Sequence, residues 1–244
     1  MVRVSYIFIS DLHLDEQRPD ITQAFVHFIN NKAASAERFF ILGDLFEVWL
    51  GDDHASDFNK LIKDTLASLT MPCYIMHGNR DFLISVDFCR ETGFELLPDP
   101  TNTILFDKPC LLMHGDSLCT GDQQYMEVRR LLRNPDTQRD LLSQSLEERA
   151  AFANRARSTS RQHTRESAMD IMDVSPDEVT RVMQEHDVKL LIHGHTHRPC
   201  IHDVNSEEYK GTRIVLGDWD KKGWYLELDQ TSYSLNSFDI GTPL

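Results

Sequence analysis

Short apolar runs recur along the chain, and each of them ends in a small polar cluster. The runs and the clusters that follow them are VSYIFIS then DLH, RFFIL then GDLFE, PCYIM then HGNRD, PCLLM then HGDS, KLLI then HGHTH, and RIVL then GDW. Stretches with helical spacing, such as ITQAFVHFINNKAASA and DFNKLIKDTLASL, lie between several of these runs. Strand, polar loop and helix in alternation are typical of α/β layering. The pattern therefore predicts an α/β fold.

Two parts of the chain depart from this alternation. Residues 119–172 contain long stretches of helix formers and no strand-like run, which predicts a helical insertion packed on the main body. One stripe at helical spacing collects aliphatic side chains of this insertion: Leu141, Leu142, Leu146, Ala150 and Ala153. Four arginines and no acid lie between 155 and 165, a basic face that either binds an anion or is solvated. From about residue 199 onward the helical spacing is lost, and the pattern predicts strands and turns.

The polar clusters carry the residue types of a binding site. Ligands of open α/β sheets gather outside the carboxyl ends of strands. Five of these strand ends deliver Asp, His or Asn, which a purely structural role of the loops does not explain. The run LLIHGHTHRP is the clearest case, because three histidines follow one apolar strand. If the chain stays extended past Gly194, His195 and His197 share a face, while His193 points away into the core.

The composition limits the class of function. The 244 residues are expected to form one domain, 1–244, that carries the insertion 119–172. A net charge of −14 argues against general nucleic-acid binding, which depends on neutralising phosphates. Five scattered cysteines without a CxxC pair indicate reduced thiols in a cytoplasmic protein. The sequence shows no signal peptide and no run long enough to span a bilayer, so we expect a protein that is soluble or lies on a membrane surface.

Taken in order, the clusters form a set of five motifs. They are DLH at 11–13, GDLFE at 43–47, GNRD at 78–81, HGD at 114–116 and GHTH at 194–197. Each string alone occurs often by chance. Chance does not explain all five together, in this order and each at the end of a strand. The set resembles the calcineurin-like metallophosphoesterases. This resemblance implies a sandwich of two β-sheets flanked by helices, with the helical insertion as a cap.

The resemblance also implies a pair of divalent cations. Two cations side by side repel, so they need a shared carboxylate, and the family pattern places Asp44 there. The remaining ligands that it implies are Asp11, His13 and His197 for one ion and Asn79, His114 and His195 for the other. Carboxylate, amide and imidazole ligands suit Mn²⁺, Fe²⁺ or Zn²⁺. Such a metal pair activates a water and clamps the attacking and leaving oxygens of a phosphoryl centre. Three acidic residues are candidates to orient these ligands: Glu47, Asp81 and Asp116.

The third motif departs from the commonest family pattern, GNHD, in which the histidine assists the leaving group. Here the position holds Arg80. Arginine does not usefully donate a proton at neutral pH, but it binds phosphate oxygens through its planar fork. A leaving group that is itself a phosphate departs as an anion and needs little acid help. Arg80 therefore favours phosphoanhydride cleavage over cleavage of simple monoesters.

Longer strings narrow the resemblance to one family within the superfamily. ILGDLFE, MHGDSLCT, IMDV, LIHGHTHRP and VLGDW resemble the lipid A pathway pyrophosphohydrolases that cleave UDP-2,3-diacylglucosamine, and the likeness covers nearly the whole chain. It implies attack of a water, activated by two Mn²⁺ ions, on the α phosphorus, which yields UMP and 2,3-diacylglucosamine 1-phosphate (lipid X). It also implies a peripheral location on the cytoplasmic face of the inner membrane.

This resemblance gives the insertion a role. A substrate with two acyl chains needs an apolar cleft beside the diphosphate site, and the leucine stripe would line it. The catalytic residues implied are Asp44, Asn79, Arg80, His114 and His195. The substrate-binding residues expected are Asn79, Arg80, Asp122, Tyr125, Arg157, Ser160, Thr164, Ser167 and His195. For the cap residues among them, ordinary helix packing stays open as an alternative.

Two other functions stay open at this point. A generic metal-dependent phosphodiesterase or nucleotide pyrophosphatase on the same scaffold would need no acyl cleft and would act on UDP-sugars without acyl chains. A metal-binding scaffold without catalysis would be stabilised by metal and would turn over no phosphate compound. Four protein ligands for each ion leave open coordination positions, which favours an enzyme. The sequence indicates no obligate protein partner.

Overall fold

Two β-sheets pack against each other in the computed structural model, which describes residues 4–166, 173–205 and 209–241, with backbone alone for 160–166. The first sheet has the spatial order β11 (Tyr233–Asp239), β10 (Lys222–Asp229), β1 (Ser5–Ile9), β2 (Arg38–Leu42), β3 (Cys73–Met76), β4 (Phe94–Leu97). The second has the order β5 (Thr101–Leu105), β6 (Lys108–Met113), β7 (Leu190–His193), β9 (Lys210–Val215), β8 (Cys200–Asn205). The predicted two-sheet architecture is confirmed, as are strands and turns after residue 199.

The strands that precede the five motifs run parallel within their sheets. In the first sheet β1 pairs with β2 and β2 with β3, all in parallel. In the second sheet β6, β7 and β9 are likewise parallel neighbours. The carboxyl ends of parallel strands meet at one edge of their sheet. The polar clusters of each sheet therefore emerge at one edge.

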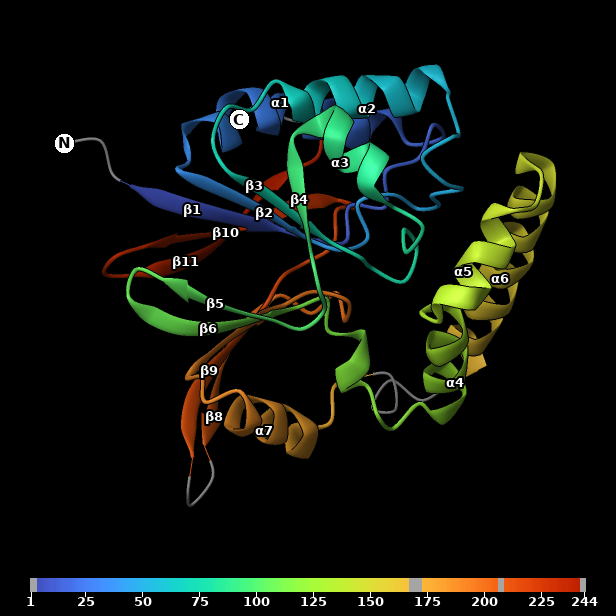
Figure 1. Ribbon diagram of the computed structural model, residues 1–244. Helices are drawn as coiled ribbons and strands as arrows, with labels where there is room; N and C mark the ends of the chain where they lie inside the picture. The colour runs from blue at the N-terminus through green and yellow to red at the C-terminus, as the bar shows by residue number, and fades with distance from the viewer. Residues whose placement is uncertain (1–3, 167–172, 206–208, 242–244) are drawn as a thin grey trace.

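The alternation of side chains along the strands separates the core into layers. In β1, Tyr6 and Phe8 join the apolar cluster between the two sheets, while Ile7 and Ile9 face the helices on the outer side. That outer side is covered by α1 (Pro19–Asn31), α2 (Asp57–Ala67) and α3 (Val86–Thr92) (Figure 1). Because both faces of these strands are covered, their sequences read as continuous apolar runs.

One helix covers the outer face of the second sheet. This is α7 (Pro176–Glu185), whose buried Val179, Val182 and Met183 pack with Leu111 and Leu191 of the strands. It begins at Ser175, whose side chain accepts a hydrogen bond from the backbone N–H of Glu178. Its start is therefore set by the local sequence, and its position by the apolar face that it buries.

The described part of the insertion, residues 119–166, contains three α-helices that lie beside the sheets rather than on them (Figure 1). They are α4 (Gln123–Leu132), α5 (Pro135–Leu142) and α6 (Leu146–Glu166), and together they are called the cap. The predicted aliphatic stripe is divided here, because Leu141 is buried whereas Leu142 and Leu146 are 40% and 36% exposed. The prediction that the whole stripe lines one apolar cleft is therefore wrong for Leu142 and Leu146. Within the described part of the chain, no helix is both long and apolar enough to cross a bilayer.

Candidate metal centre

The strand-end loops bring the seven predicted ligands into two adjoining groups. The ligands are Asp11 and His13 after β1, Asp44 after β2, Asn79 after β3, His114 after β6, and His195 and His197 after β7. The two loops after β1 and β2 are joined by the backbone, since the N–H of Asp11 donates to Gly43 and that of His13 to Asp44. The sequence order of the motifs thus becomes a spatial cluster at the strand ends.

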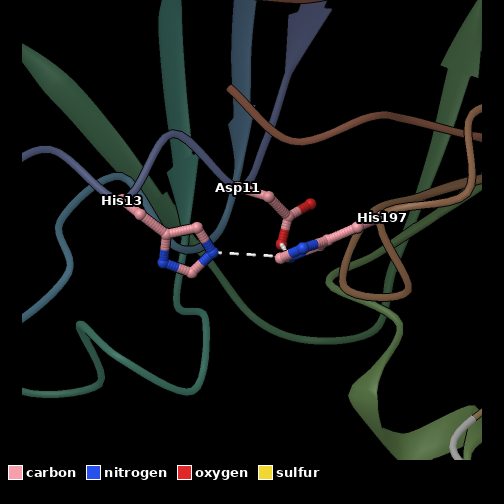
Figure 2. A group of neighbouring side chains, drawn as sticks. All are labelled: Asp11, His13 and His197. Atoms are coloured by element: carbon pink, nitrogen blue, oxygen red, sulfur yellow. Dashed lines mark hydrogen bonds and ion pairs between the residues drawn. The ribbon is translucent and has the colours of Figure 1, made fainter. Parts of the chain in front are cut away.

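The first group consists of Asp11, His13 and His197 (Figure 2). The His197 Nε2 lies 3.4 Å from the Asp11 Oδ1 and 3.4 Å from the His13 Nε2. The Asp11 Oδ1 is buried and faces the His197 ring, while the other oxygen accepts the backbone N–H of His195 at 2.9 Å. Two imidazole nitrogens and a buried carboxylate oxygen that converge in this way are a donor set that fits a divalent cation.

The second group is built around Asn79, His114 and His195. The Asn79 Oδ1 lies 3.2 Å from the His114 Nε2 and 3.1 Å from the His195 Nδ1. Asp44 lies between the two groups, since its Oδ2 is 3.8 Å from both the His13 Nε2 and the His114 Nε2. Its other oxygen accepts the backbone N–H of Arg80 at 2.8 Å. The carboxylate thus presents one oxygen to both groups, as a residue shared between two cations must.

The backbone at the ligands is in an uncommon conformation. Five of them have positive φ: Asp11 at 56°, His13 at 49°, Asp44 at 52°, His195 at 67° and His197 at 55°. Asp, Asn and His are enriched in this left-handed region, but each such residue costs on the order of 1–3 kcal/mol. Among the described non-glycine residues only Phe106, Asp107 and Asp187 share the property. Backbone strain concentrated in the residues of one cluster is typical of a functional site.

Two glycines allow these loops to approach one another closely. A Cβ on Gly78 would clash with the Asp44 carboxylate, and one on Gly194 would clash with the Asp11 carboxylate. Asp81 connects the loops further, because its two oxygens accept the backbone N–H groups of Gly78 and Leu45, at 2.7 and 2.8 Å. The glycines of GNRD and GHTH are therefore explained by packing against the carboxylates.

Partners outside the centre set the orientation of the imidazoles. The His114 Nδ1 lies 2.9 Å from the Leu42 carbonyl oxygen, the His13 Nδ1 lies 3.2 Å from the Glu47 carboxylate, and the His197 Nδ1 lies 3.7 Å from the Asp218 carboxylate. The acceptor at the His114 Nδ1 favours the tautomer whose Nε2 faces the centre. The carboxylates of Glu47 and Asp218 place negative charge beside the Nδ1 atoms of His13 and His197, which favours a cation on the other side of each ring.

Buried carboxylates give the centre a negative potential. Burial opposes protonation of His197, but the hydrogen bond and charge of Asp11 raise its pKa to about 9. Burial likewise opposes protonation of His114, and the charges of Asp44 and Asp116 raise its pKa to about 9. Burial acts against the charge of Asp11, yet the hydrogen bond to His197 holds the pKa of Asp11 well below its ordinary value. The site stabilises positive charge, as a cation site requires.

The predicted substrate-binding residues of the cap that the structure describes have different surroundings. Tyr125 has its ring centroid 5.5 Å from that of His195 and donates its hydroxyl to Asp116 at 3.0 Å. Asp122 is buried and accepts the backbone N–H of Tyr125 as the N-cap of α4. Arg157 pairs with Glu47. Ser160 and Thr164 fall where only the backbone is described, and Ser167 lies outside the described residues.

A cleft lined mostly by apolar side chains lies between the cap and the body and reaches Asn79 of the centre. Its apolar wall comes mainly from Trp49, Phe82, Leu132, Leu141 and Phe152. Its polar lining includes Glu47, Asn79, Arg80 and Arg157. The Arg80 Nε is buried and has no hydrogen-bond partner, so a donor is available for an acceptor brought by a ligand.

Ionic contacts attach the cap to the body at both of its ends. In α4, the Arg129 Nε lies 2.8 Å from the Asp116 carboxylate, which follows the metal-ligand candidate His114 in the chain. In α6, Arg149 donates to the Leu50 carbonyl at 2.6 Å and pairs with Asp53 at 2.5 Å. No local pattern pointed to Arg129 or Arg149, because their acids lie in distant parts of the sequence. Asp218 was also missed, although its place after the apolar run RIVL was a signal of the same kind as the motifs.

The comparisons with known proteins agree with this geometry. The profile of the family described as calcineurin-like phosphoesterase matches residues 4–199. A UDP-2,3-diacylglucosamine hydrolase of Pseudomonas fluorescens (strain Pf0-1) is 48% identical over 241 residues, covering 98% of this chain and 97% of that protein. One of Pseudomonas aeruginosa (strain UCBPP-PA14) is 50% identical over 240 residues, covering 97% and 100%. A solved structure described as a novel archaeal phosphodiesterase has a TM-score of 0.50 at 14% identity, covering 96% of this chain and 100% of that chain, and shares the fold.

Proposed function

The chain belongs to the calcineurin-like phosphoesterase family, and on this premise we propose that it hydrolyses UDP-2,3-diacylglucosamine at the pyrophosphate bond, giving UMP and 2,3-diacylglucosamine 1-phosphate (lipid X), in the biosynthesis of lipid A. One observation carries this proposal. The apolar cleft under the cap is lined by Asn79 and Arg80 where it reaches the candidate metal centre. A diphosphate and the acyl chains attached to it need these two environments side by side.

The resident cations are proposed to be two Mn²⁺ ions per chain. The donors are carboxylate, amide and imidazole groups, and no cysteine belongs to either group of candidate ligands among the described residues. Such a set fits Mn²⁺ better than metals that prefer sulfur. Asp11, His13 and His197 would hold one ion, Asn79, His114 and His195 the other, and Asp44 both. Bound there, a divalent pair supplies Lewis acidity toward a water and toward the phosphate oxygens.

The protein itself contributes charge, orientation and exclusion of water. Arg80 would bind oxygens of the diphosphate through its guanidinium, whose Nε is buried without a partner. Asp44 holds the two ligand groups in a fixed relation, and the cap covers the cleft. The sugar 1-phosphate leaves as an anion when water attacks the α phosphorus. The reaction therefore needs no residue at position 80 that donates a proton to the leaving group. The arginine at this position therefore fits a pyrophosphate substrate.

The location is proposed to be peripheral, on the cytoplasmic face of the inner membrane. The support comes from apolar side chains that the cap leaves exposed, which are Val128, Leu131, Leu142 and Leu146. Exposed apolar side chains on amphipathic helices are typical of surfaces that lie in the boundary of a bilayer. The test is flotation with vesicles of phosphatidylethanolamine and phosphatidylglycerol. The wild-type protein should float, and a variant with Leu131→Ser and Leu142→Ser should float less.

A product assay tests the function directly. UDP-2,3-diacylglucosamine is incubated with metal-free protein, with and without Mn²⁺, and UMP is quantified by chromatography. We expect UMP only with the cation. We also expect a rate at least about a hundredfold lower on UDP-N-acetylglucosamine, which lacks the two long acyl chains, because the apolar cleft contributes nothing to its binding. Equal rates on both substrates would favour the generic nucleotide pyrophosphatase instead.

A further inference from the structure

Glu47 lies between the metal centre and the cap. One oxygen, Oε2, is 3.2 Å from the His13 Nδ1, on the side of the ring opposite the Nε2 that faces His197. The other oxygen, Oε1, is 3.0 Å from the Nε of Arg157 in α6. The carboxylate is 16% exposed and the Arg157 side chain 23%, so water screens this pair only in part. A single side chain thus contacts a candidate metal ligand and the cap.

The backbone fixes Glu47 in this place. Its N–H donates to the Leu14 carbonyl at 3.1 Å, next to a short parallel bridge between Leu14 and Phe46. His13 precedes Leu14 directly and its own N–H donates to the Asp44 carbonyl, so backbone hydrogen bonds join the two loops at His13 and at the residue after it. The orientation of the Glu47 carboxylate is consequently determined by its side-chain partners, one of which belongs to the cap.

From this arrangement we infer that Glu47 is a positioning residue through which the cap controls how tightly the His13 side of the centre binds its cation. The carboxylate, 3.2 Å from the His13 Nδ1, favours the ring orientation in which the Nε2 faces Asp44 and His197. Arg157 holds the second carboxylate oxygen and so restricts the rotamers of Glu47. When α6 moves away, the carboxylate gains freedom and the ring loses its fixed orientation. The inference rests on the proposed function only in that the cap covers a substrate.

The same contacts allow a second role for Arg157, in which it binds substrate and nothing else. The two roles differ in the substrate-free protein. If Arg157 acts only on substrate, its removal leaves cation affinity unchanged and raises KM. If it acts through Glu47 and His13, its removal weakens cation binding even when no substrate is present.

The experiment is a titration of metal-free protein with Mn²⁺, without substrate, followed by calorimetry and by electron paramagnetic resonance of free Mn²⁺. The variants are Glu47→Gln, Arg157→Ala, their combination, and Arg155→Ala. For Glu47→Gln we expect one of the two binding steps to weaken by about tenfold, as for other residues that orient a ligand. For Arg157→Ala we expect a loss of about threefold to tenfold in the same step, in the range of pairwise coupling. Arg155, exposed on the same helix, is the matched control and should bind like the wild type.

The combined variant decides the mechanism. If Arg157 acts through Glu47, the double variant binds Mn²⁺ no more weakly than Glu47→Gln alone, and Arg157→Lys recovers part of the loss. Wild-type affinity in Arg157→Ala, or losses that multiply in the double variant, would overturn the inference. Thermal unfolding of the metal-free variants checks that each is folded. A failure to hydrolyse UDP-2,3-diacylglucosamine would refute the proposed function but leave this binding result unaffected.

Discussion

The strand-end centre and the cap differ in how deeply their side chains are buried and in which contacts hold them in place. In the centre, backbone hydrogen bonds join neighbouring loops, and Asp11, Asp44 and His114 are almost fully buried. In the cap, most side chains of α4 and α5 are at least partly exposed, and Leu141 is the buried apolar residue of the described cap helices. Ion pairs such as Arg149–Asp53 and Arg129–Asp116 connect the cap to the body.

This difference assigns catalysis to the centre and substrate binding to the cap. Burial and strained loops make the ligand geometry of the centre stiff, as cation binding requires. Few buried apolar contacts and partly exposed ion pairs give the cap a lower free energy of local opening than the sheets. We therefore expect changes in the centre to affect turnover, and changes in the cap to affect affinity and local stability.

The largest effect is expected from Asp44→Ala. Its Oδ2 is the atom that faces both ligand groups, so its removal takes the shared carboxylate from the centre. Turnover of UDP-2,3-diacylglucosamine should fall by at least about a hundredfold, as when a preorganised electrostatic group is removed. UMP release measures this, and calorimetry should show fewer than two Mn²⁺ bound. The exposed Asp140→Ala in α5 is the control; turnover near the wild-type rate in Asp44→Ala would contradict the two-ion centre.

A smaller effect within the centre is expected from Arg80→His. The guanidinium is replaced by a ring that binds phosphate oxygens less well but can donate a proton. Activity on the pyrophosphate substrate should fall by about tenfold to a hundredfold, while the ratio of p-nitrophenyl phosphate hydrolysis to pyrophosphate hydrolysis rises. Both rates are measured at saturating Mn²⁺, and affinity for Mn²⁺ should stay unchanged. An unaltered ratio would refute the role of Arg80 in substrate choice.

In the cap, Arg149→Ala should loosen α6 without affecting the sheets. The variant loses the pair with Asp53 and the hydrogen bond to Leu50. Because Asp53 is 58% exposed, we expect a loss of about 1–2 kcal/mol in the local stability of the cap rather than the larger value of a fully buried pair. Hydrogen exchange should become faster in α5 and α6 and stay the same in β1 and β2. Equally faster exchange in the strands would mean that the two regions unfold as one.

The smallest effect is a dependence of stability on pH at the contact between the regions. Burial opposes ionisation of Glu47, but the hydrogen bond to His13 and the charge of Arg80 lower its pKa from 4.5 to about 2. A carboxylate with a lowered pKa stabilises the folded state fully above its ordinary pKa and loses this contribution as the pH falls toward the lowered value. Urea unfolding of metal-free protein between pH 6 and pH 3 should show a steeper loss for the wild type than for Glu47→Gln. Parallel curves would show that the contact contributes no stability.

Most of the fold could be predicted from the sequence because its signals are local. The runs RFFIL and KLLI became β2 and β7, since a strand buried on both faces is apolar along its length. The cap was less predictable: the spacing of Leu141, Leu142 and Leu146 shows that they can share a face, but not what that face packs against.

Local sequence is enough to predict which side chains stand at the strand ends, because a residue that directly follows a parallel strand must emerge at the edge where its neighbours end. The equal distances of the Asp44 Oδ2 from His13 and His114, and the place of Glu47 between His13 and Arg157, follow from packing alone. Those relations join segments far apart in the chain, and they depend on how the sheets and the cap pack. No spacing along the sequence encodes them.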